Sequence, residues 1–213
     1  MFILNQNNSI ANQFLAELRD IHIQKDRLRF RKNLERVGEI LAYEVSKALP
    51  YTPSSITSPL AKVETPLLKE QPVIIAVLRA AVPFYQGVLN FFDQADSGFI
   101  GAYRKESDDK IEISLNYLAA PNLTGKTVLI VDPMLATGKS FIKSIDAIKG
   151  HGKPKQIEIL SAFAAPEGIK HIKENLDLPH RFWIGALDEK LNQQSYIVPG
   201  LGDAGDLAFG PKI

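Results

Sequence analysis

Short apolar runs alternate with stretches of helical periodicity along most of the chain. The runs cover residues 73–78, 127–131, 157–164 and 182–187, and the first of them (VIIAVL) is rich in β-branched residues. Runs of this kind are typical of strands that are buried on both faces of a sheet. Helical patterns follow up to residue 91 and over residues 140–149 and 166–175. The alternation predicts an α/β fold with a mostly parallel, twisted sheet flanked by helices.

The segment before these runs has a different pattern. Ser9 precedes a short amphipathic stretch, and a longer helix is predicted over about residues 27–49, where apolar residues recur at steps of three and four. Prolines between residues 50 and 66 exclude a continuous helix there and leave room for one edge strand, at residues 56–65.

A further strand is predicted near residues 99–103 and a hairpin arm at residues 111–118. The polar run KESDDK lies between them, at residues 105–110. A charge run of this kind forms a solvated loop, or here a flap that excludes water from an active site.

These patterns predict one domain with three parts. Residues 1–66 form an N-terminal helical arm with the edge strand, residues 67–187 form the α/β core, and residues 188–213 form a C-terminal loop region. The stretch from Pro199 is so rich in glycine that we expect no regular element in it.

Composition narrows the classes of function. The 25 basic and 24 acidic residues give a formal charge of +1, which argues against a protein that coats nucleic acid. The chain has no cysteine, which excludes disulfides, zinc–thiolate sites and cysteine nucleophiles. The apolar run at the N-terminus is too short for a signal peptide, and Arg79 interrupts the most apolar stretch. We therefore expect no transmembrane helix and a cytoplasmic location.

Residues 128–140, VLIVDPMLATGKS, carry the strongest chemical signal. A buried strand ends at Asp132, a tight loop follows, and a helix begins near Lys139. The first N–H groups of a helix have no partners within it, and the helix dipole favours an anion there. Thr137 and Ser140 add hydroxyl donors, and Gly138 lets the backbone close around a phosphate. The alternative interpretation is a capped helix without a ligand.

The Gly-Lys-Ser triplet also raises the possibility of a P-loop for nucleoside triphosphates. That motif requires a glycine five residues before Gly138, and Pro133 occupies the position. The P-loop interpretation therefore fails.

The run VDPMLATG closely resembles the phosphoribosyl-diphosphate (PRPP) loop of phosphoribosyltransferases, in the Asp-Pro version that marks uracil phosphoribosyltransferases. Other segments match that family in order and spacing: VLRA at 77–80, YR at 103–104, APEGI at 165–169 and YIVPGLGDAGD at 196–206. The resemblance runs from about Arg27 to the C-terminus. It implies a phosphoribosyltransferase-like fold and an enzyme that transfers the phosphoribosyl group from PRPP to uracil, giving UMP and pyrophosphate.

The resemblance also implies roles for individual residues. Arg79 and Arg104 would hold the diphosphate, a task that suits the guanidinium fork, whereas the alternative for each is a surface ion pair. The expected catalytic residues are Arg79, Arg104, Asp132 and Asp203. The expected PRPP-binding residues are Arg79, Arg104, Asp132, Pro133, Met134, Leu135, Ala136, Thr137, Gly138, Lys139, Ser140 and Asp203.

The tail would recognise the base, largely through main-chain groups. The expected uracil-binding residues are Ile197, Gly202, Asp203 and Ala204, and the alternative is a glycine-rich surface turn. The sequence departs from the family pattern at Ala81 and Val82, and at Lys139, where glycines are common.

The resemblance further implies Mg²⁺ bound mainly through PRPP, so no metal-binding residue is named. It implies a homo-oligomer, either a dimer or a tetramer, and leaves open regulation by GTP or CTP. Neither nucleic acid nor a membrane is expected as a partner. Two rivals remain: a transferase for another base, such as a purine, and a nucleotide-sensing regulator that binds RNA.

Overall fold

A computed structural model describes the backbone of residues 1–107 and 110–211 and the side chains of residues 1–101 and 117–211. Its main sheet contains β1 (Phe2–Ile3), β4 (Val73–Leu78), β5 (Ser97–Ser107), β6 (Lys110–Ala119), β7 (Thr127–Val131), β8 (Met134–Leu135), β9 (Gln156–Ala164) and β10 (His180–Leu187). The strand order is β1-β10-β9-β7-β4-β5-β6, with β8 beside β9. Pairing is parallel from β1 to β5, and β6 joins β5 in an antiparallel hairpin.

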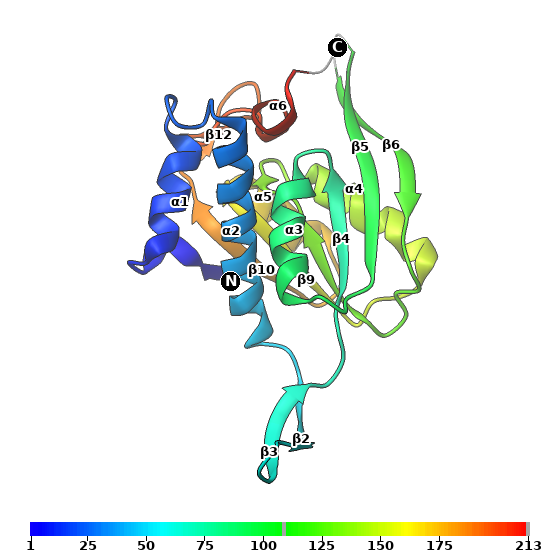
Figure 1. The fold of residues 1–213 in the computed structure, drawn as a ribbon. Coiled ribbons are helices and arrows are strands. Elements are labelled where there is room, and N and C mark those ends of the chain that lie inside the picture. The colour runs from blue at the N-terminus through cyan, green and yellow to red at the C-terminus, as the bar shows by residue number, and fades with distance from the viewer. Residues whose placement is uncertain (108–109, 212–213) are drawn as a thin grey trace.

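Helices cover both faces of this sheet. The helices are α1 (Ile10–Arg19), α2 (Arg27–Ser46), α3 (Ala81–Phe91), α4 (Lys139–Ile148), α5 (Pro166–Asn175) and α6 (Ala204–Phe209), with short 3-10 turns η1 (Leu4–Gln6) and η2 (Lys149–His151). Helices α1, α2 and α3 lie on one face of the sheet, and α4 and α5 lie on the other (Figure 1). Side chains of α1, α2 and α3 share one apolar core with the sheet, and those of α4 and α5 share the other. Within the described residues, no helix combines the length and the apolar composition needed to cross a bilayer.

The buried strands explain the two cores. Ile74 and Ala76 of β4 belong to the core under α1 to α3, whereas Val73 and Ile75 belong to the core under α4 and α5. Alternate side chains of a strand point to opposite faces, so a strand with both faces covered must be apolar throughout. The predicted fold class is therefore confirmed, together with the strands expected at β4, β7, β9 and β10.

The N-terminal helices also form where the sequence predicts them. Ser9 caps α1, because its hydroxyl accepts a hydrogen bond from the Ala11 N–H at 3.3 Å. Helix α2 ends at Ser46 rather than near residue 49, since the residue before Pro50 is disfavoured in the helical region.

A buried carboxylate joins α1 to α2. Glu17, whose side chain is 5% exposed, accepts two hydrogen bonds of 2.7 Å from Arg29. It also accepts bonds from Asn33 at 2.7 Å and from Gln13 at 2.9 Å. The hydrogen bond from Arg29 is the largest cause that lowers the pKa of Glu17, to about 2.

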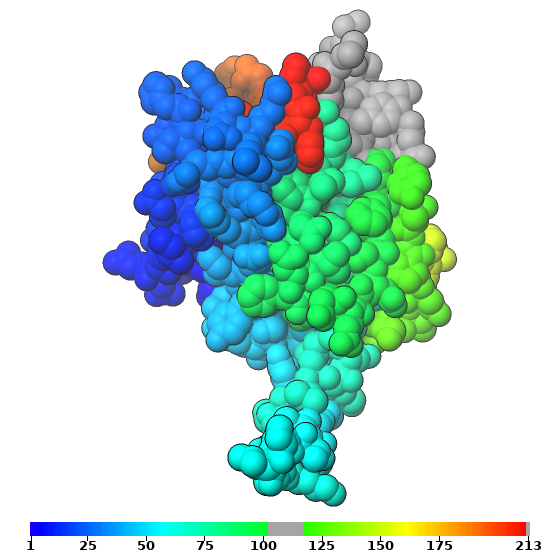
Figure 2. All heavy atoms as spheres, viewed as in Figure 1, coloured from blue at the N-terminus to red at the C-terminus, as the bar shows by residue number. Residues whose placement is uncertain are grey.

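The region of prolines differs from the prediction. The expectation of one edge strand at residues 56–65 is wrong, because β2 (Tyr51–Thr57) and β3 (Lys62–Leu68) form an antiparallel hairpin that is separate from the main sheet. Pro53 and Pro66 lie opposite one another in this hairpin. Each of its strands is an edge, where the missing N–H of proline is tolerated. The hairpin projects from the body of the molecule (Figures 1 and 2).

The C-terminal tail is also more regular than predicted. It contains the strand pair β11 (Lys190–Leu191) and β12 (Ile197–Val198), followed by α6. Asp203 caps α6, since its carboxylate accepts a hydrogen bond from the Asp206 N–H at 3.0 Å. An aspartate cap of this kind offsets the low helix propensity of a glycine-rich segment.

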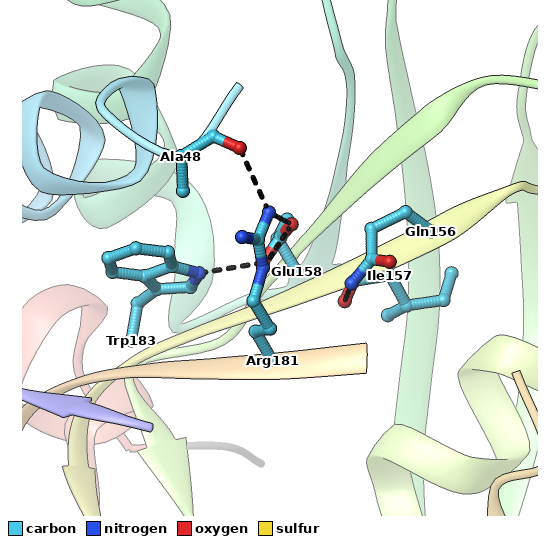
Figure 3. Close-up of polar contacts among 6 residues, drawn as sticks. All are labelled: Ala48, Gln156, Ile157, Glu158, Arg181 and Trp183. Carbon is cyan, nitrogen blue, oxygen red and sulfur yellow. Dashed lines mark hydrogen bonds and ion pairs between the residues drawn. The ribbon is translucent and has the colours of Figure 1, made fainter. Parts of the chain in front are cut away.

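A second buried carboxylate lies near the beginning of β9 (Figure 3). Glu158 is fully buried and accepts hydrogen bonds from Arg181 and, at 2.7 Å, from the indole N–H of Trp183. Arg181 also donates to the Ala48 carbonyl at 3.3 Å. This cluster therefore fastens the chain after α2 to β9 and β10, near their amino ends.

Candidate active site

Three parallel strands place polar residues at one edge of the sheet. Arg79 follows β4, Asp132 follows β7 and Asp188 follows β10. Strands β4 and β7 pair directly, with Ala76 opposite Val131. In open α/β sheets, ligands bind at the edge formed by the carboxyl ends of the strands.

The predicted phosphate loop, residues 132–140, leads from β7 through β8 into the first turn of α4. Its start is fastened to β9, because Phe163 donates its N–H to the Pro133 carbonyl and Ala165 donates to the Leu135 carbonyl, each at 2.9 Å. Asp132 turns the chain, since its carboxylate accepts a hydrogen bond from the Met134 N–H at 3.1 Å. The loop therefore has a fixed path over the end of the sheet.

Two glycines let this loop pack closely against α5. Gly138 has φ +75°, and a Cβ atom there would lie 2.6 Å from the Gly168 carbonyl oxygen. A Cβ atom on Gly168 would lie 2.2 Å from the Ala136 carbonyl oxygen. Both contacts are too short for any residue other than glycine. The segment APEGI, residues 165–169 at the beginning of α5, therefore packs directly against the loop.

The beginning of α4 has the features expected of an anion site. Gly138 is the N-cap residue, and among the described side chains none caps this helix. The Thr137 hydroxyl, which precedes the N-cap, accepts a long hydrogen bond of 3.4 Å from the Lys139 N–H. The Lys139 side chain is exposed and Ser140 is partly buried. The backbone N–H groups of this first turn therefore lie at the same edge as Asp132.

Arg79 contacts the C-terminal tail. Its guanidinium donates to the Asp206 carboxylate at 2.9 Å and to the Gly210 carbonyl at 3.1 Å. The side chain remains 39% exposed. Arg79 therefore lies at the predicted edge, with an ion-pair partner from α6.

The predicted base-binding residues form the turn before α6. Ile197 and Ala204 are buried, whereas Gly202 has φ +95° and Asp203 caps the helix. A Cβ atom on Gly205 would lie 3.1 Å from the Asp203 carboxylate and 3.7 Å from the Arg79 guanidinium. The fold thus brings Asp203 and Arg79 together. Figure 1 shows α6 at the end of the molecule where β5 and β6 also extend.

Arg104 is the predicted site residue that the structure leaves open. It lies on β5, which continues beyond the end of β4, and its side chain is outside the described part of the chain. The side chains of the predicted flap, residues 105–110, also lie outside the described part of the chain, as does the backbone of residues 108–109.

Sequence reasoning missed three charged residues near the site: Arg19, Asp188 and Asp206. Asp188 and Asp206 carried a usable signal, because the first follows a predicted strand at the ligand-binding edge and the second lies within GLGDAGD. Arg19 ends an amphipathic helix and gave no such signal.

A mostly parallel sheet, with the predicted phosphate loop after a central strand and a C-terminal turn at the same edge, is the arrangement expected of the phosphoribosyltransferase class of enzymes. Within this class, the family model of uracil phosphoribosyltransferase matches residues 5–211. The chain belongs to the uracil phosphoribosyltransferase family. The family and enzyme class predicted from the motifs are thereby confirmed, and the match includes α1, which precedes the segment recognised from sequence.

Individual relatives agree with this assignment. A uracil phosphoribosyltransferase of Porphyromonas gingivalis is 43% identical over 211 residues, which cover 99% of this chain and 98% of that protein. One from Pyrococcus furiosus is 39% identical over 204 residues, covering 94% and 86% respectively. Among solved structures, the AQ2163 protein from Aquifex aeolicus is 31% identical and superposes with a TM-score of 0.86, covering 100% of both chains.

Proposed function

We propose that this protein transfers the 5-phosphoribosyl group of PRPP to uracil, with release of pyrophosphate, as a step of pyrimidine salvage. The observation that carries the proposal is the meeting of the loop at residues 132–140, Arg79 and the turn at residues 197–204 at one edge of the sheet. In the reaction, a bond forms between N1 of uracil and C1′ of the ribose while the bond from C1′ to the diphosphate oxygen breaks. The N1 proton passes to water, and the diphosphate leaves as pyrophosphate.

The phosphate loop supports the binding of the ribose phosphate end of PRPP. The N–H groups at the beginning of α4 and the Thr137 and Ser140 hydroxyls are suitable donors to the 5-phosphate. We propose that Asp132, which follows β7, accepts hydrogen bonds from ribose hydroxyls. Residues 133–136 would line the phosphate site with their backbone, whose path is held by the bonds to the Pro133 and Leu135 carbonyls.

Arg79 supports the binding of the diphosphate, with Arg104 proposed as its partner. Negative charge builds up on the diphosphate as it leaves, and fixed cations lower the free energy of that transition state. In the structure the Arg79 guanidinium pairs with Asp206. The diphosphate would therefore compete with this carboxylate for Arg79.

The turn at residues 197–204 supports the binding of the base. Uracil presents two carbonyl oxygens and an N3–H, which irregular backbone can match with its own N–H and C=O groups. Gly202, with φ +95°, leaves the approach to this backbone open because it has no side chain. We propose that Ile197, Gly202, Asp203 and Ala204 contact uracil and that Asp203 also contacts the ribosyl substrate.

The acidic residues of this edge fit a Mg²⁺ ion that arrives with PRPP. Within the described side chains there is no group of three or more His, Asp or Glu residues that would hold a metal by itself. Mg²⁺ commonly uses one or two carboxylates together with substrate phosphates and water, and Asp132 and Asp203 are two carboxylates at this edge that could take that part. The ion would supply positive charge to the leaving diphosphate.

The remaining expectations are part of the same proposal. We propose a homo-oligomer, a dimer or a tetramer, of one-domain subunits, and the projecting β2–β3 hairpin supports it by exposing Ile56, Leu60 and Val63. Because PRPP and UMP are anionic and cross membranes poorly, we also propose a cytoplasmic location. Regulation by GTP or CTP is a hypothesis that adding each nucleotide to the assay would test.

The direct test measures pyrophosphate release with Mg²⁺ and PRPP while uracil is compared with cytosine, hypoxanthine and orotate. Release with uracil alone, matched by UMP, supports the proposal. Release with a purine base would replace it with a transferase for another base. If the protein binds PRPP and turns over none of the bases, a regulatory protein becomes the better interpretation. Binding of RNA at physiological salt would then distinguish that case.

A further inference from the structure

Arg19, the last residue of α1, contacts two segments far away in the sequence. Its guanidinium forms a two-pronged ion pair with Asp188, with one bond of 2.8 Å, and donates to the Gly200 carbonyl at 3.0 Å. The guanidinium carbon also lies 4.4 Å from the centre of the Phe163 ring. This arginine therefore joins the N-terminal arm to the carboxyl edge of the sheet.

Asp188 is buried and forms further hydrogen bonds besides those with Arg19. Its side chain is 4% exposed, and its backbone N–H donates to the Ala164 carbonyl at 2.8 Å. Its carboxylate accepts the Gly200 N–H at 2.9 Å. A buried carboxylate is stable only when it is paired and hydrogen-bonded, so Asp188 depends on Arg19.

Together these two side chains hold both polar backbone groups of Gly200. The Gly200 carbonyl is bound by Arg19 and its N–H by Asp188. Gly200 has φ +56°, and a Cβ atom there would lie 2.1 Å from the Ile197 carbonyl oxygen. The path of the chain through the turn at residues 197–204 is thus set at this one glycine.

We propose that Arg19 and Asp188 are positioning residues that set the shape of the base-binding turn, so that α1 determines the affinity for uracil. This inference rests on the proposed function, because it takes residues 197–204 to be the base site. Neither side chain is required to touch a substrate. Their effect passes through the backbone of Gly200 and acts mainly on the base, since neither side chain takes part in the backbone hydrogen bonds that fasten the phosphate loop at Pro133 and Leu135.

The test compares Arg19→Ala with Arg29→Ala. Arg29 of α2 also binds α1, through Glu17, and within the described residues it forms no hydrogen bond or ion pair with the turn. Loss of a charge-assisted hydrogen bond corresponds to about a tenfold change in affinity. We expect Arg19→Ala to raise KM for uracil about tenfold while KM for PRPP stays within about twofold, and Arg29→Ala to change neither.

Two further variants distinguish a specific effect on the base-binding turn from a general loss of stability. Arg19→Lys keeps the charge without the planar fork, so its KM for uracil should lie between those of the wild type and Arg19→Ala. In the pair Arg19→Ala and Asp188→Asn, the second substitution should add little to the first, because both break one network. Equal rises in both KM values, or the same result in Arg29→Ala, would overturn the proposal.

A measurement without catalysis distinguishes this inference from the proposed function. Amide hydrogen exchange should be faster at residues 200–204 in Arg19→Ala than in Arg29→Ala, whatever base the enzyme uses. Unchanged exchange there would refute the positioning role even if uracil is the substrate. Faster exchange in a protein that does not use uracil would refute the proposed function and leave the structural role intact.

Discussion

The substitution Glu17→Gln should remove a contribution to folding that depends on pH. Hydrogen bonds from Arg29, Gln13 and Asn33 lower the pKa of Glu17 from 4.5 to about 2. A carboxyl group whose pKa is lowered by folding stabilises the protein above its unfolded pKa, and this stabilisation is lost as the pH falls through the folded pKa. The contribution of Glu17 is therefore complete above about pH 4.5 and is lost between about pH 4.5 and 2.

The magnitude follows from the two pKa values. A change from 4.5 to about 2 corresponds to about 3 kcal/mol of stability, of which about 2 kcal/mol has been lost at about pH 3. The Arg29 side chain is 51% exposed, so solvent screens part of the attraction and about 3 kcal/mol is an upper bound.

Urea unfolding, followed by circular dichroism at one protein concentration, measures this contribution. The free energy of unfolding of Glu17→Gln should be lower than that of the wild type by about 2 to 3 kcal/mol near pH 7, and by about 1 kcal/mol or less near pH 3. Glu174→Gln is the control, since Glu174 is exposed and lies 3.8 Å from Lys170. A difference for Glu17→Gln that stays constant from about pH 7 to 3 would refute the reasoning.

Three other substitutions test the site and its support. Gly168→Ala should push the phosphate loop away from α5, raise KM for PRPP and lower the free energy of unfolding by about 1 to 3 kcal/mol. Gly150→Ala is the control: open space surrounds Gly150, so KM for PRPP and the free energy of unfolding should stay unchanged. Glu158→Ala should lower the free energy of unfolding by about 3 kcal/mol, because Arg181 and the indole of Trp183 lose their partner. Its kcat and KM should equal those of the wild type, and altered kinetics would instead place this cluster in the active site. Asp132→Asn should keep the bond to Met134 and the fold while kcat/KM falls about a hundredfold, and wild-type kinetics would rule out its proposed role.

The features predicted correctly are those with a local cause. Strands β4 and β9 are apolar throughout because both faces of the sheet are covered, and this gives a continuous signal in the sequence. Ser9 caps α1 through a residue two positions away. Gly138 marks the beginning of α4 because the backbone conformation itself needs glycine.

The features that could not be predicted from the sequence depend on partners far away in the chain or on competing local preferences. Arg79 and Asp206 are separated by 127 positions, and nothing local selects one carboxylate from the 24 in the chain. Arg19 and Asp188 are 169 positions apart. Helix α6 could not be predicted because Gly205 within it and the glycines on either side of it outweigh the capping signal of Asp203.

Trp183, the single tryptophan of the sequence, is placed to give a fluorescence signal with a simple meaning. Its indole is 8% exposed, is bonded to Glu158 and packs 5.7 Å from the Phe2 ring, so its emission should be that of a shielded chromophore. Strand β1, which carries Phe2, pairs with β10 at Trp183 itself. The emission spectrum therefore reports whether β1 is paired with β10, and the measurement needs no added label.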